Sequence, residues 1–92
     1  MIQLILTSPF QSQELEQALA YRQSDDVLVL MQDAVVAATA PLWSERLTGV
    51  PLYVMREDLQ ARGLQSRIGM DLEMAGLVAL IAEKGSPQTW GG

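Results

Sequence analysis

The sequence predicts an α/β domain of three layers, in which a small, mainly parallel sheet carries helices on both faces. Residues 51–64, which read PLYVMREDLQARGL, encode a strand, a polar turn and a short helix, and so form half of a β-α unit. The apolar run at 27–31 does not alternate with polar residues, which is typical of a central parallel strand buried on both faces.

In the first half of the chain, strands and helices are expected to alternate. The first strand is predicted at residues 2–6. Ser12 is expected to cap the helix that follows, because apolar residues recur at helical spacing behind it: Leu15, Ala18 and Leu19. The strand at 27–31 leads into a helix of small residues over 34–40, which Pro41 ends.

In the middle of the chain, a short turn of helix is expected over residues 42–47, with Trp43 packing inward. A third strand follows at 52–55. The next helix ends at Arg62 and Gly63, which supply a cation for the last turn and a glycine suited to a left-handed cap.

The last helix is expected to begin at Asp71 as its N-cap, after a short strand over 68–70, and to end at Lys84-Gly85. Its inward side is predicted to hold Met74, Leu77, Val78 and Ile81. Residues 86–90 are too few for a helix and are expected to form an edge strand that carries an exposed aromatic side chain, Trp90.

Length and composition predict one domain, residues 1–92, that associates with a partner. A chain of this size forms a marginal core by itself. Because 49% of its residues are nevertheless apolar, surplus apolar surface is expected to favour an interface.

Charge and hydropathy exclude several other classes of partner. The 11 acidic residues against 6 basic ones give a net charge of −5, so no direct contact with nucleic acid is expected. No basic region precedes the first apolar stretch, and no apolar run approaches the ~20 residues of a membrane span. We therefore expect a soluble, cytoplasmic protein.

The residues that most enzymes use are missing. The sequence has no cysteine and no histidine, so it offers no thiol nucleophile, no usual neutral-pH base and no partner for a serine triad. It also has no cluster with metal-ligand spacing and no phosphate-binding loop. We expect no catalytic residue, no cofactor and no metal site.

Asp33 has two interpretations. It follows a buried strand, where open α/β sheets place active groups, and receiver-type signalling domains carry a phosphorylatable aspartate at such a position. Those domains also need an acidic pair after the first strand, but Thr7-Ser8-Pro9 stands there. A structural cap on the following helix is the favoured role for Asp33.

Three residues are candidates for an interface. Tryptophan is enriched at interface hot spots. Trp90 is expected to dock on a partner, since it lies near the end of the chain after Pro87. Trp43 is a second candidate, although packing in the core is slightly preferred for it. Arg62 is a third: it could form an ion pair across an interface, although the favoured role is that of a cation at the end of its helix.

Four segments resemble the DsrH/TusB family of sulfur-relay subunits. They are LTSPF at 6–10, LVLMQDAVVAA at 28–38, EDLQARGL at 57–64 and the terminal Trp90, and the resemblance runs from Leu4 to Trp90. No single segment is specific to this family, but the order and spacing of the four segments are. Ala34 and Ile5 depart from the glycine and histidine that many relatives have.

The resemblance implies a DsrE/DsrF/DsrH-type fold and a place in a TusBCD-like complex. TusC-like and TusD-like partners are implied, in a heterohexamer that passes persulfide sulfur toward tRNA 2-thiouridine. Because this chain has no cysteine, the active thiol would belong to another subunit. A DsrH-like subunit of sulfur-oxidising metabolism is the nearest alternative. A freestanding homo-oligomer and, weakly, a divergent receiver-type domain also stay open.

Overall fold

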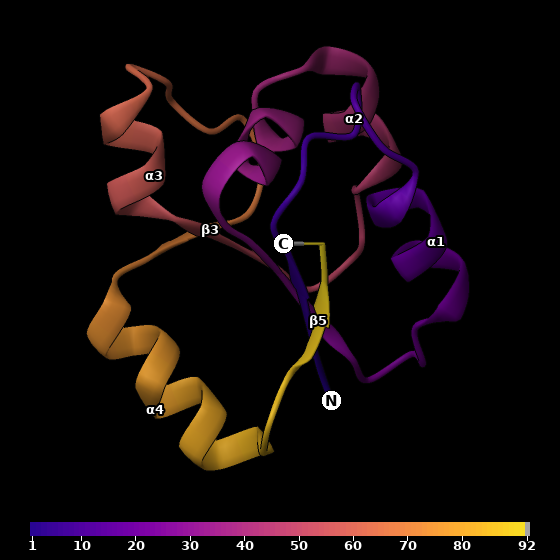
Figure 1. Ribbon diagram of the computed structural model, residues 1–92, viewed down its shortest axis with the longest axis vertical. Helices are drawn as coiled ribbons and strands as arrows, with labels where there is room; N and C mark the ends of the chain where they lie inside the picture. The colour runs from indigo at the N-terminus through magenta and orange to yellow at the C-terminus, as the bar shows by residue number, and fades with distance from the viewer. Residues whose placement is uncertain (92) are drawn as a thin grey trace.

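Within residues 1–91, which the computed structural model describes, five strands form one sheet in the order β4-β3-β2-β1-β5 (Figure 1). Every neighbouring pair is parallel, so the sheet that the sequence predicted as mainly parallel is parallel throughout. The strands are β1 (Ile2–Ile5), β2 (Val27–Leu30), β3 (Leu52–Met55), β4 (Met70–Leu72) and β5 (Gln88–Trp90).

The connecting helices divide unequally between the two faces of the sheet. They are α1 (Glu14–Tyr21), the 3₁₀ helix η1 (Gln32–Ala38), α2 (Pro41–Arg46), α3 (Arg56–Ala61) and α4 (Met74–Lys84). The chain steps from β1 to β4 in one direction, and right-handed crossovers place the helices of these steps on one face. The step from β4 to β5 returns across the sheet, so α4 lies on the opposite face (Figure 1).

The side chains of β2 alternate between two apolar clusters. Leu28 and Leu30 pack in the larger cluster, with residues from α1, η1, α2 and α3. Val27 and Val29 pack in the smaller cluster, beneath α4. All four are buried, which confirms the prediction that this strand is covered on both faces.

A chain of polar contacts runs through the larger cluster. Gln3 of β1 is completely buried, and its Nε2 donates to Oδ2 of Asp26 at 3.1 Å. Its Oε1 accepts a hydrogen bond from Nε1 of Trp90 in β5 at 2.8 Å. The buried carboxylate of Asp26 also accepts the backbone N–H of Gln23 and lies 3.0 Å from the N-terminal ammonium group of Met1. These contacts satisfy the buried polar groups and join β5 to β1.

The prediction that Asp33 caps the helix after β2 was wrong. That segment is a 3₁₀ helix that begins at Gln32, with Met31 at its N-cap and no side-chain cap hydrogen bond. Asp33 therefore lies inside the first turn, where its carboxylate reaches Arg62 instead.

The C-terminal half holds two further differences. Asp71 does not cap α4, because it lies within β4 and Glu73 precedes the helix. The buried residues of α4 are Leu77 and Leu80, whereas Met74 and Val78, which were predicted to pack inward, are exposed. The segment has no polar residue between Met74 and Ala82 that would indicate its outer side.

The end of α3 follows the expected pattern. Arg62 is its C-cap residue, and Gly63 has a φ of +64°. This left-handed conformation is the one that a glycine adopts after a helix end at little cost. At the end of α4, Gly85 is likewise the C-cap residue after Lys84.

The buried carboxyl group of Asp26 predicts a dependence of stability on pH. The backbone N–H of Gln23, then the N-terminal ammonium group and Gln3, lower its pKa from 3.8 to about 2, against the opposing effect of burial. Because the folded pKa is the lower one, the charged carboxylate stabilises the fold above about pH 4. This contribution, roughly 2 kcal/mol, is lost as the pH falls from about 4 to about 2.

We therefore expect Asp26→Asn to lower the free energy of unfolding at pH 7 by roughly 2 kcal/mol and to flatten its change between about pH 4 and pH 2. Urea unfolding at a series of pH values measures both quantities. Asp25→Asn, a change at the exposed neighbouring residue, is the matched control and should leave the curve nearly unchanged. Equal curves for the two variants would contradict the role given to Asp26.

Candidate functional site

Two hollows lie around α3 and the loop after it, next to the residues that follow β1, β2 and β3. In open α/β sheets, ligands bind outside the carboxyl ends of the strands, so this region is the first place to look for chemistry. Leu64, in the loop after α3, lines both hollows.

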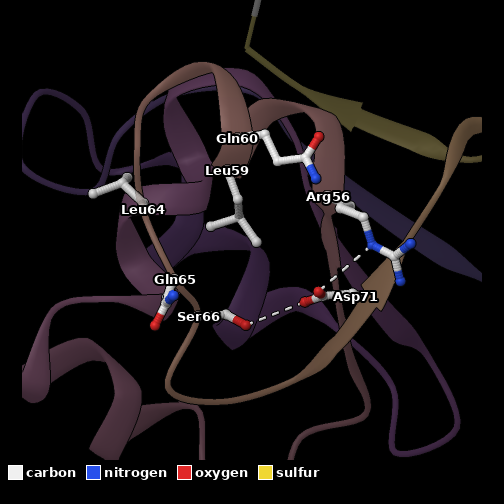
Figure 2. Close-up of a pocket in the computed structure, with 7 residues that line it drawn as sticks. All are labelled: Arg56, Leu59, Gln60, Leu64, Gln65, Ser66 and Asp71. Carbon is white, nitrogen blue, oxygen red and sulfur yellow. Dashed lines mark hydrogen bonds and ion pairs between the residues drawn. The ribbon is translucent and has the colours of Figure 1, made fainter.

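The larger hollow has a volume of about 680 Å³ and a mostly polar wall (Figure 2). Arg56 comes from the start of α3, Ser66 from the loop after it and Asp71 from β4. Figure 2 shows Ser66 and Arg56 turned toward Asp71. Oγ of Ser66 donates to Oδ1 of Asp71 at 3.2 Å, and Nε of Arg56 lies 3.7 Å from Oδ2.

The guanidinium group of Arg56 is therefore already engaged. Besides Asp71, it pairs with Glu73 through Nη1. Two carboxylates around one guanidinium leave no excess positive charge to hold an anion. The hollow offers hydrogen-bonding groups to a partner, including the amides of Gln60 and Gln65 on its wall.

The smaller hollow, of about 270 Å³, brings together two residues that the sequence singled out separately. Nη2 of Arg62 donates to Oδ1 of Asp33 at 2.8 Å, across 29 positions of the chain. Nη1 of Arg62 also lies 3.7 Å from Oδ1 of Asp58, one helical turn earlier. Because Asp33 is exposed, this pair contributes at most about 1 kcal/mol to stability.

Asp58 has a role that the sequence did not reveal. Gln32 has a φ of +52°, which is uncommon for a residue other than glycine. Its backbone N–H donates to Oδ2 of Asp58 at 2.9 Å, so the carboxylate supports this turn at the end of β2. The two residues are 26 positions apart, and only the packing of α3 beside η1 brings them together.

Few side chains near the carboxyl ends of the strands could take part in a reaction. Oγ of Ser8, on the wall of the smaller hollow, accepts the backbone N–H of Phe10 and so forms a local turn. Among residues 1–91, no three side chains of the metal-binding types are placed to hold a cation together. A receiver-type site would need such a group beside Asp33.

The two tryptophans lie in different surroundings. Trp43 is only 7% exposed and packs in the larger cluster, with the guanidinium carbon of Arg46 4.2 Å from its ring centre. Trp90 is half-buried, not exposed as predicted, because β5 pairs with β1 and holds the ring against the same cluster. Its ring also meets that of Tyr21 edge-on at 5.9 Å.

None of the helices that the structure describes within residues 1–91 is both long enough and apolar enough to cross a membrane.

The contact between Trp90 and Gln3 leads to a prediction about stability. Trp90→Phe keeps an aromatic ring beside Tyr21 but leaves the buried Oε1 of Gln3 without a donor. We expect the free energy of unfolding to fall by about 1–3 kcal/mol, measured by urea denaturation. As a control, Tyr21→Phe keeps the ring contact and should change it by less than about 0.5 kcal/mol. An unchanged stability in Trp90→Phe would refute this account.

Comparisons with known proteins show the family of the chain and support its fold. Residues 7–86 match the family described as DsrH like protein. Protein TusB of Erwinia tasmaniensis is 36% identical over 84 residues, which cover 88% of this chain and 87% of that protein. The crystal structure of the ychN protein from E. coli superposes with a TM-score of 0.70 at 22% identity, over 96% of this chain and 97% of the other, and supports the fold alone. The chain belongs to the DsrH-like protein family.

Proposed function

We propose that this protein is a non-catalytic subunit of a sulfur-relay complex. The observation that carries the proposal is membership of the DsrH-like family in a chain that has no cysteine. A persulfide relay needs a thiolate that accepts sulfur and releases it again. The protein therefore takes part through binding, while a partner carries the sulfur.

The polar groups around α3 support a binding role. Arg56 and Arg62, which could otherwise attract an anionic substrate, are paired with carboxylates of the same chain. The sequence has no histidine that could activate a serine. These groups stabilise loops of the protein and leave hydrogen-bonding surface for a neighbour.

The partners that we propose are TusC-like and TusD-like subunits in a heterohexamer. The pathway that we propose for this complex is the formation of 2-thiouridine in tRNA, which places it in the cytoplasm. The family match supports this assignment, as does the relative named Protein TusB. A DsrH-like role in sulfur oxidation would use the same kind of subunit in another pathway.

We also propose contact roles for two of the singled-out residues. Trp90 and the 59% exposed Tyr21 form an aromatic pair beside the edge strand β5, a surface that suits a partner. Arg62 lies on the wall of the smaller hollow, where a partner could share its charge with Asp33. Trp43 is too deeply buried to contribute much contact area.

The absence of a thiol predicts that the purified chain does not retain sulfur. We expect no covalent label after incubation with a cysteine desulfurase and ³⁵S-cysteine, because the sequence has no cysteine to form a persulfide. Non-reducing gel electrophoresis with autoradiography measures the label. A subunit of the proposed complex that contains a cysteine, treated in the same way, is the positive control. Label retained on this chain would refute the non-catalytic role.

Deletion of the gene in its source organism tests the pathway. We expect the 2-thiouridine content of tRNA, measured by mass spectrometry of nucleosides, to fall by at least tenfold and to return when the gene is restored. The expected cause is the loss of a subunit that the relay complex needs for assembly. Normal 2-thiouridine together with slower sulfur oxidation would instead support the alternative pathway, and no change in either would contradict both.

A further inference from the structure

Helix α4 is apolar on all sides until its last two residues, which is unusual for a helix at a protein surface. Residues 74–82 read MAGLVALIA and contain no polar side chain. Leu77 and Leu80 face the sheet and are buried. The outer side is exposed, and Val78, for example, is 61% exposed. In water, a helix that is apolar all round belongs in an interior, so this outer side is suited to a covering partner.

The apolar surface extends beyond the helix to the strand beside it. Met70 of β4 is 66% exposed, and it lines a hollow of about 360 Å³ together with Tyr53 and Pro51. Tyr53 also packs against the cluster beneath α4, so the hollow and the helix belong to one surface. We call this surface the α4 face and define it by Tyr53, Met70, Met74, Val78, Ala79 and Ala82.

We propose that the α4 face binds a different folded subunit, of a size comparable to this chain, which packs a helix against α4. The inference rests on the proposed function, since it names the surface through which the relay subunit joins its complex. Three observations decide the kind of occupant: the size of the surface, the side chains along the helix, and the charge of the chain.

The size of the surface favours a domain over a peptide. The nine apolar residues of the helix, 74–82, give a strip about 14 Å long and about 10 Å wide. A stable interface buries about 800 Å² on each partner, roughly a sixth of the 5084 Å² surface of this chain. The strip by itself has a much smaller area than this requirement of about 800 Å². A partner must therefore also cover the hollow at Tyr53 and Met70, which requires a folded domain.

The outer side chains of α4 favour a helix as the contacting element. Ala75, Ala79 and Ala82 recur at the spacing of one helix side, and all three are exposed. Interaxial distances depend on the side chains at the contact, so alanines allow a close approach. Val78 stands between them as the larger apolar contact.

Charge disfavours a second copy as the occupant. The chain carries a net charge of −5, so two copies would bring like charges together around an uncharged strip. The charges nearest the ends of α4 do not change this balance, because Arg56 is paired with Asp71 and Glu73 at the first end, and Glu83 adjoins Lys84 at the other. A partner with a neutral or basic rim fits better.

Paired substitutions on opposite faces test the proposal. Val78→Glu places a charge on the α4 face, and Leu42→Glu places the same charge at a 66% exposed leucine of α2, whose neighbours pack on the other face. The probes are the purified TusC-like and TusD-like subunits of the source organism, and sedimentation velocity measures binding. We expect the wild-type chain alone to be monomeric and to bind these subunits. Val78→Glu should weaken the Kd at least tenfold, and Leu42→Glu less than threefold.

The outcomes separate this inference from the proposed function. If the wild-type chain binds these subunits and Val78→Glu binds them equally well, the proposal that the α4 face is the interface is wrong, whereas the sulfur-relay role stands. No binding of the wild-type chain to either subunit overturns both. A wild-type dimer that Val78→Glu dissociates overturns the choice of a different subunit. If Val78→Glu unfolds the chain, as circular dichroism would show, Ala79→Glu on the same strip replaces it, and the same expectations hold.

Discussion

The right-handedness of parallel crossovers is the constraint from which the shape of this protein follows. Three successive steps across the sheet in one direction put α1, η1, α2 and α3 on the same face. The single return step leaves α4 to cover the other face. The first face is therefore thick and well filled, whereas the second has one helix over a sheet of five strands within residues 1–91. This asymmetry explains why exposed apolar surface gathers around α4.

The polar contacts on the first face help to hold the short edge strand β5 in place. The edge strand β5 has only three residues, so its backbone ladder with β1 is short. The hydrogen bond from Trp90 to Gln3, and that from Gln3 to Asp26, add side-chain contacts to this ladder. Gln3 and Asp26 are buried, and both they and Trp90 have hydrogen-bond partners, so these contacts fix the position of β5 more firmly than its length suggests.

Features that depend on neighbouring residues could be predicted from the sequence. The bounds of β3, the burial of β2 on both faces and the place of Gly63 after α3 all follow from local patterns. The order of four short segments was enough to indicate the family that the comparisons confirm.

Features that depend on contacts between distant residues could not be predicted from the sequence. Asp33 pairs with Arg62, which is 29 positions away in the chain. The sequence instead suggested that Asp33 caps the helix directly after it, and the structure has no such cap hydrogen bond. Trp90 pairs with Gln3 across 87 positions, so its burial could not be inferred from its place near the chain end. On α4 the periodic pattern itself was uninformative, because apolar residues stand on every side.

The position of β5 beside β1 has a consequence for folding during synthesis. The edge of β1 that faces away from β2 cannot be covered until residues 88–90 have left the ribosome, which follows the synthesis of β2, β3 and β4. Until then, this edge of β1 has no partner strand and Oε1 of Gln3 lacks its donor from Trp90, so the nascent sheet presents a template for other chains. Closure of this edge of the sheet is a late, non-local event, so chaperone binding would protect the chain most in the interval before β5 arrives.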